Sequence, residues 1–180
     1  NTQRNGVYSE RKRVLQKDNL RDWIIEYAER SLYDLTLYIK DSSDSQHLDI
    51  LTFKLQELLG IPFKINLANK NLNTQQLTSF LQQQFQITYS LKEIEMESVE
   101  PMLLRELERS FLLQQIDMSW KEHLQKISSL KESVRWRAYG QKDPLTEYKK
   151  ESFNLFVNML ARIRHRVTYF ILRSKIIIEA

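Results

Sequence analysis

The longest regular pattern of apolar positions in the chain begins at Leu113 and ends at Val134. Its apolar residues recur at steps of three and four, the spacing that places side chains on one stripe of an α-helix. They are Leu113, Ile116, Trp120, Leu124, Ile127, Leu130 and Val134. A second stripe of the same kind is made by Leu145, Tyr148, Phe156, Met159, Ile163, Val167 and Phe170. The pattern therefore predicts two long amphipathic helices in succession.

The segment between the two stripes predicts how these helices are joined. A short loop over residues 136–143 lets them fold back on each other as an antiparallel hairpin. Asp143 can cap the free N–H groups of the second helix, and Pro144 suits its first position because proline has no N–H to lose. We expect the loop to project into solvent. Polar and aromatic side chains lie in or beside it: Arg135, Trp136, Arg137, Tyr139, Gln141 and Lys142.

The stripes also predict which residues hold the hairpin to its neighbours. We assign four of them to the core: Trp120, Leu124, Ile127 and Phe156. Truncation of a buried Trp120 to alanine should cost about 3–5 kcal/mol. His123 directly precedes Leu124, so we expect it at the flank of the packed stripe, in a structural role rather than as a ligand or an acid/base group.

Polar, turn-forming stretches divide the rest of the chain into three parts. Residues 1–40 are predicted to form a long helix that is broken near 17–19. The polar run 41–45 then marks a boundary. Residues 41–97 follow as a small inserted lobe of short helices, and residues 98–180 hold the hairpin.

Within the predicted lobe, single residues mark helix ends. Gly60 is the kind of residue at which a helix closes in left-handed geometry. Asn73 can cap the helix that follows. Ser90 and Glu93 match a capping box, which allows a further helix start at Ser90.

Composition favours an all-α fold. Three Gly and three Pro in 180 residues are too few for the many tight turns of sheets, and 28% charged residues suit helices with one solvated face. We therefore expect a long helix packed on an antiparallel two-helix hairpin, with a small inserted helical lobe. The absence of cysteine excludes a disulfide framework and thiolate metal sites, and no apolar run approaches the ~18 residues that span a bilayer. The chain opens at Asn1 without methionine, so we expect an excised fragment.

The sequence carries no pattern typical of an enzyme site. A phosphate-binding P-loop needs two glycines five positions apart followed by lysine, and Gly6, Gly60 and Gly140 are isolated from one another. The three histidines, at positions 47, 123 and 165, lack the spacing that metal sites on helices use. We therefore expect no catalytic residue, no metal and no bound nucleotide in this piece.

Several strings resemble a known family. LLQQIDMSWKEHL, RAYGQKDP and LTEYKKESFNLF look like the two-helix finger of SecA, the ATP-driven motor that pushes preproteins through the SecY channel. The opening string NTQRNGVYSERKRVL is similar to the end of that family's long scaffold helix. The resemblance thus covers both ends of the chain, while residues 41–97 match by position and helical character.

The resemblance implies a role for each part. Residues 1–40 would be helical scaffold, 41–97 the helical wing, and 98–180 the rest of the scaffold with the finger. Tyr139 would meet the translocating polypeptide, beside Trp136 and Gln141. The basic side chains of the tip, Arg135, Arg137 and Lys142, would seat it at the channel mouth.

The same resemblance implies the partners and the location. The partners would be a SecY-type channel complex, the preprotein and the remaining motor domains, with an anionic membrane surface as a further candidate. ATP and Mg²⁺ would serve the full-length motor, with no cofactor in this piece. The protein would be cytoplasmic and peripheral to a bacterial inner membrane, or in the plastid stroma at the thylakoid membrane.

Two other functions stay open from the residues alone. A pI near 9.2 with Trp136 and Tyr139 among arginines is compatible with a nucleic-acid-binding helical module. However, the basic residues do not gather along one face, so we do not expect nucleic acid as a partner. A plain structural bundle is the other alternative. The logarithm of a binding constant that depends on phosphate contacts falls linearly with the logarithm of salt concentration. A salt titration therefore separates the nucleic-acid-binding module from the other functions.

Overall fold

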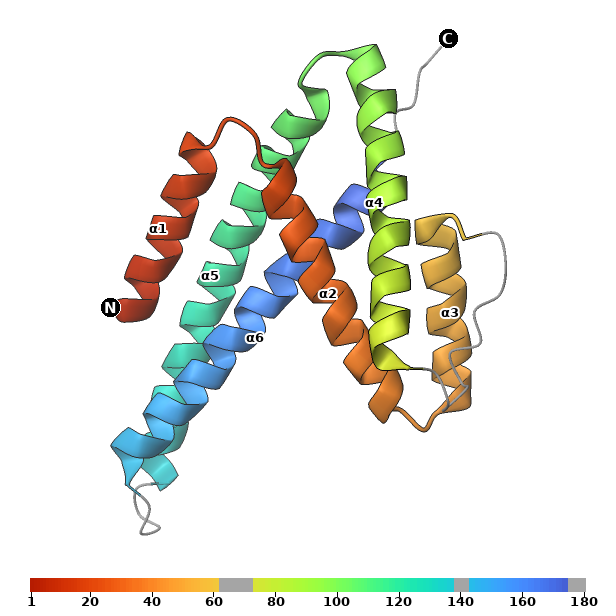
Figure 1. Ribbon diagram of the computed structural model, residues 1–180. Helices are drawn as coiled ribbons and strands as arrows, with labels where there is room; N and C mark the ends of the chain where they lie inside the picture. Colours follow the sequence, from red (N-terminus) through yellow and green to blue (C-terminus); the bar gives the residue numbers. More distant parts are fainter. Residues whose placement is uncertain (62–72, 138–142, 175–180) are drawn as a thin grey trace. The chain divides into compact units, whose positions relative to one another are not determined.

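The computed structural model describes residues 1–61, 73–137 and 143–174. These ranges contain six helices and no strand (Figure 1), which confirms the predicted all-α fold. The helices are α1 (Thr2–Gln16), α2 (Arg21–Asp41), α3 (Ser45–Leu59), α4 (Thr74–Val99), α5 (Leu103–Arg137) and α6 (Pro144–Arg173). In the described ranges, no helix is both long enough and apolar enough to cross a membrane.

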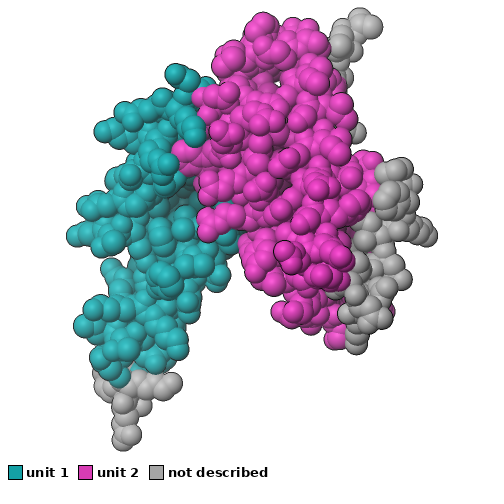
Figure 2. Space-filling model, in the orientation of Figure 1, with its two compact units in different colours: residues 1–18, 109–166 teal, residues 19–108, 167–180 magenta. Residues whose placement is uncertain are grey.

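The chain divides into two compact units (Figure 2). Unit 1 consists of residues 1–18 and 109–166, and unit 2 consists of residues 19–108 and 167–180. The helices α5 and α6 each contribute to both units. Within unit 2, α2 packs along α4. The predicted lobe at 41–97 stays a prediction.

Unit 1 contains the predicted hairpin. Its first helix, α5, continues to Arg137, and α6 begins at Pro144. Asp143 caps α6 as expected, since its carboxylate accepts the Leu145 N–H at 3.1 Å and the Thr146 hydroxyl at 2.6 Å. A hydrogen bond to a free backbone N–H group stabilises the helix start. The tip loop between the two helices, 138–142, lies outside the described residues.

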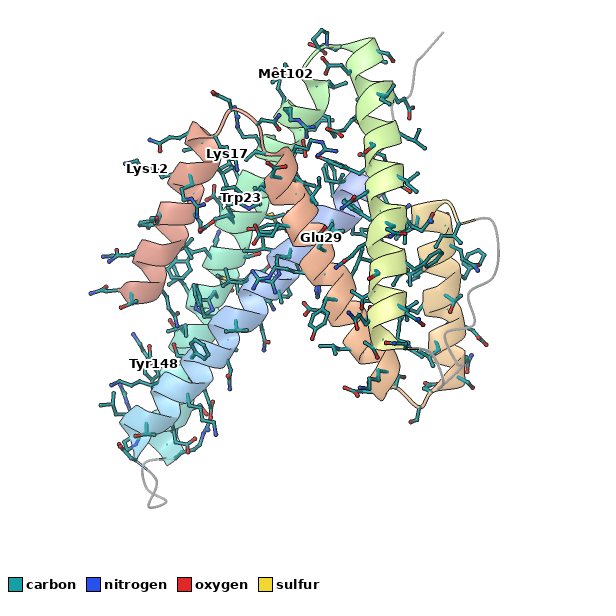
Figure 3. All side chains as sticks on the ribbon, in the orientation of Figure 1. Lys12, Lys17, Trp23, Glu29, Met102 and Tyr148 are labelled. Carbon is teal, nitrogen blue, oxygen red and sulfur yellow. The ribbon has the colours of Figure 1, made fainter. Side chains whose placement is uncertain are left out.

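Unit 2 is built on the pairing of α2 with α4. Ile24, Ala28, Leu81 and Phe85 are fully buried and come from these two helices. Polar contacts reinforce the pair: Glu29 on α2 accepts hydrogen bonds from two glutamines of α4, at 3.3 Å to its carbonyl and 3.2 Å to its carboxylate (Figure 3 labels Glu29). Gln82 and Gln86 of α4 therefore contact α2 as well as solvent.

The short helix α3 lies against α4. Its ends follow the sequence signals, since Asp44 accepts two backbone N–H groups at its start and Gly60 adopts a left-handed φ of 64° at its end. Thr88 on α4 donates its hydroxyl to the Leu59 carbonyl at 2.8 Å. That bond satisfies one of the free carbonyls that every helix C-terminus leaves.

The structure corrects the possible helix start at Ser90. Asn73 caps α4 as expected, with its side chain accepting the Gln75 N–H at 2.9 Å, but the helix then runs unbroken to Val99. Ser90 therefore lies in the helix interior. The physical reason is burial, because Tyr89 is 1% exposed and stacks on Phe85, so tertiary packing outweighs the local capping signal.

Candidate functional site

The candidate site is the loop end of the α5–α6 hairpin. Tyr139, Gln141 and Lys142 lie outside the described residues. Arg135, Trp136 and Arg137 form the last turn of α5 and are exposed, with Trp136 at 75%. The structure thus gives the position of three of the six predicted contact residues.

Arg137 has a structural contact of its own at this end of the hairpin. Its guanidinium donates to the Ser133 hydroxyl at 2.8 Å, one turn back on α5, and pairs with the Glu151 carboxylate on α6. The hydrogen bond that Arg137 donates to the Glu151 carboxylate is the main cause that raises the pKa of Arg137. This ion pair ties the two helices together beside the loop. Arg137 was predicted only as an external contact, and its pair with Glu151 was missed because it joins residues on different helices.

The core assignment needs one correction. Trp120, Ile127 and Phe156 are half-buried, but Leu124 is 48% exposed. The reason is that α5 also buries polar side chains, each one position before an apolar residue of the predicted stripe. These are Gln115, Ser119 and His123, spaced one turn apart. The buried face of α5 therefore includes these polar positions, and Leu124 lies outside it.

A buried histidine joins three helices of unit 1. His123 on α5 is fully buried, and its Nε2 lies 2.8 Å from Oε1 of Gln3 on α1. The amide nitrogen of Gln3 donates in turn to Ser152 on α6, to its hydroxyl at 3.0 Å and to its carbonyl at 3.3 Å. We call Gln3, His123 and Ser152 the three-helix trio.

The trio fixes the tautomer of His123. A carbonyl only accepts hydrogen bonds, so the Gln3 group at Ser152 is the NH₂ and the group at His123 is the oxygen. His123 therefore carries its proton on Nε2. Its Nδ1 is buried without a hydrogen-bond partner among the described residues. The ring centroids of Trp120 and Phe156 lie 5.4 Å and 5.8 Å from the imidazole.

The surroundings of His123 disfavour its charged form. Burial lowers the pKa of His123 below its ordinary value of 6.5, and the positive charges of Arg162 and Lys126 lower it further. A second proton would sit on Nδ1, which has no acceptor. His123 is thus held as a neutral hydrogen-bond donor, which agrees with a structural role rather than with acid/base chemistry.

A second buried cluster lies in unit 2, at the start of α5. Glu108 is fully buried, accepts the Tyr89 hydroxyl at 2.6 Å and pairs with Arg105. Arg105 also pairs with Glu93 on α4, which Arg21 on α2 contacts at 3.0 Å. Burial is the main cause that raises the pKa of both Glu108 and Tyr89. The cluster ties α2, α4 and α5 together.

The sequence alone does not indicate this second cluster. Its charged residues alternate in sign, as they do on any solvated helix face, and only the fold brings the three helices together. The described ranges contain no group of three or more His, Asp or Glu side chains that could hold a metal ion.

These features define a class of protein, namely an all-helical module built around a long capped hairpin. The family model described as the SecA Wing and Scaffold domain matches residues 1–175. The chain therefore belongs to the SecA wing and scaffold family.

Relatives that carry the printed name "Protein translocase subunit SecA" are similar over nearly the whole chain. The protein from Emiliania huxleyi is 59% identical over 98% of this chain, and that from Antithamnion sp. is 45% identical over 99%. The protein from Thermosynechococcus vestitus is 38% identical over 94%. The aligned part covers 20%, 20% and 19% of those relatives, so this chain spans about a fifth of their length.

Proposed function

We propose that this chain works in Sec-type protein translocation, as the scaffold, wing and two-helix finger of an ATP-driven motor. The observation that carries the proposal is the match of residues 1–175 to the SecA Wing and Scaffold domain. In this proposal, the finger is the hairpin of α5 and α6. Its loop end would enter the mouth of a SecY-type channel and contact the preprotein.

The hairpin has properties that suit a part that pushes. The Arg137–Glu151 pair joins its two helices beside the loop, and Asp143 caps α6 on the other side. The loop is thus framed by two fixed helix ends. Tyr139 within it would grip the polypeptide, since a tyrosine ring packs on apolar segments and hydrogen-bonds to polar ones without selecting a sequence.

The remaining partners and cofactors belong to the same proposal. ATP and Mg²⁺ would bind in other parts of the full-length protein, and this chain would transmit their effect. Arg135 and Lys142 would attract acidic groups at the channel mouth, and an anionic membrane surface nearby would attract them as well. The protein would work at the inner face of a bacterial membrane, or at the stromal face of the thylakoid.

Site-specific crosslinking in the full-length protein tests the proposal. A photoreactive amino acid at position 139 or 136 should crosslink to a preprotein stalled in the channel and to the channel itself. Phe53 on α3 supplies a matched control, because it is an aromatic side chain with 68% exposure against 75% for Trp136. Crosslinks of equal yield from position 53, or none from 139, would contradict the finger assignment.

A loss-of-function variant gives a second test. Tyr139→Ala should leave the fold and ATP hydrolysis of the full-length protein intact while preprotein transport falls, because a side chain that contacts the preprotein rather than the core contributes little to stability. If Tyr139→Ala unfolds the protein, the ring packs within the fold rather than contacting the preprotein. If transport is unchanged, the loop is not the contact surface.

A further inference from the structure

We propose that Gln3 is a positioning residue that sets the register of the α5–α6 hairpin on α1. It acts through the three-helix trio, binding His123 on α5 and Ser152 on α6 at the same time. This inference rests on the proposed function and deepens it. It identifies how a push on the hairpin passes into the scaffold helix.

The geometry of Gln3 allows one register. The two ends of its amide make different bonds, the oxygen to His123 and the nitrogen to Ser152. If the amide turned over, its oxygen would face the Ser152 carbonyl, which cannot donate, so the observed orientation is the one that satisfies both neighbours. A displacement of either helix along α1 therefore breaks the contact of that helix.

The apolar contacts of α1 do not provide the same constraint. Val7 and Val14 are its buried apolar residues, and hydrophobic contacts are non-directional. Two further polar ties are exposed. Arg11 pairs with Asp117 at 2.9 Å, with side chains 40% and 52% exposed, and Arg109 on α5 donates to the Lys17 and Asp18 carbonyls just after α1, so water competes with both ties. The three-helix trio is the directional contact that includes a fully buried side chain, His123.

The bare Nδ1 of His123 is a further sign that position matters here more than stability. A buried polar atom without a partner destabilises a fold, and a well-packed apolar side chain would avoid that loss. The polar arrangement instead specifies one alignment. Because a helix rises 1.5 Å per residue, a slip of α5 by one residue would move the loop end by about 1.5 Å.

Replacement of Gln3 by methionine in the full-length protein tests the inference. Methionine has a similar length and helix propensity but makes neither hydrogen bond. Gln16→Met is the matched control, since Gln16 is exposed on the same helix. Four quantities are measured for each variant: the melting temperature, ATP hydrolysis, preprotein transport, and the distance distribution between spin labels on exposed Ser9 and Asn158.

For Gln3→Met we expect a folded protein with a lowered melting temperature, because the buried Nε2–H of His123 loses its acceptor, and retained ATP hydrolysis. The distance distribution between α1 and α6 should broaden, and transport should fall by about tenfold, as small misplacements of working groups do. Gln16→Met should resemble the unmodified protein in all four. An unchanged distance distribution, or normal transport with a broadened one, would overturn the inference.

Ser152→Ala keeps the test decisive if Gln3→Met does not fold. It removes the hydroxyl acceptor and leaves the carbonyl, so we expect the same changes in smaller size. Normal distances and transport in Ser152→Ala would then overturn the inference. Failure of the proposed function looks different. The protein that carries the photoreactive amino acid at position 139, with Gln3 and Ser152 unchanged, would then give no preprotein crosslink, whatever the spin-label distances show.

Discussion

The hydroxyl of Tyr89 lies 2.6 Å from Oε2 of Glu108, and both residues are shielded from solvent at 1% and 0% exposure. A buried carboxylate is tolerated only when hydrogen bonds and an opposite charge replace its hydration. Tyr89 supplies the hydrogen bond and Arg105 the charge. The start of α5 is thereby fixed to α4 within unit 2.

Removing that hydroxyl should destabilise the chain. Tyr89→Phe keeps the ring but takes one donor from the buried Glu108, and leaving a buried acceptor short of a partner costs about 1–3 kcal/mol. The free energy of unfolding by urea measures the loss. Tyr33→Phe is the control, because Tyr33 is 50% exposed and should change stability by less than about 0.5 kcal/mol. Equal effects at both positions would show that the Tyr89–Glu108 bond adds nothing.

Two leucines on α5 test the corrected buried face. Leu130 is 7% exposed and Leu124 is 48% exposed. Leu130→Ala should therefore cost about 2–5 kcal/mol, as large-to-small changes in cores do. Leu124→Ala should cost less than about 0.5 kcal/mol. Urea unfolding of the two variants measures these losses of stability. A larger loss for Leu124→Ala would support the buried face that the sequence pattern predicted.

The buried imidazole makes stability depend on pH in a stated direction. Because the pKa of His123 is lowered in the fold, the unfolded chain binds more protons below the ordinary value of 6.5. The free energy of unfolding should thus fall as pH decreases through 6.5 toward the folded pKa. Above 6.5 the contribution of neutral His123 to stability is fully present. His123→Gln should flatten this dependence between pH 7.5 and 5. His165→Asn, at an exposed position, should keep it. An unchanged slope in His123→Gln would assign the dependence to other groups.

Most of the fold could be predicted from the sequence because its helix ends carry local signals. Asp143 before Pro144, Asn73 and Gly60 all act as the sequence suggested. Such signals depend on neighbours in sequence, so they do not need the tertiary structure. Ser90 is the instructive failure, since the burial of Tyr89 beside it outweighs the cap.

The buried polar contacts could not be predicted in the same way. Gln3 and His123 are 120 positions apart, and Tyr89 and Glu108 lie on different helices. Periodicity counts polar residues as outward-facing, so it assigned Leu124 rather than His123 to the buried face. The family strings, by contrast, identified the family because they record residue identity and not only polarity.

The backbone at Met102 offers a last test. This residue links α4 to α5 with a left-handed φ of 67°, while its N–H donates to the Glu97 carboxylate at 3.1 Å. A left-handed conformation costs most L-residues about 1–2 kcal/mol, and asparagine tolerates it better.

Met102→Asn should therefore raise the free energy of unfolding by about 0.5–1 kcal/mol. Met102→Gly should gain less, because glycine relieves the strain but adds freedom to the unfolded chain. Met118→Asn is the matched control: Met118 has 45% exposure against 50% for Met102 but sits inside α5, where asparagine is the poorer helix former and should destabilise. Opposite signs in urea unfolding would identify backbone strain as the cause. Destabilisation at both positions would show that the turn at Met102 is not strained.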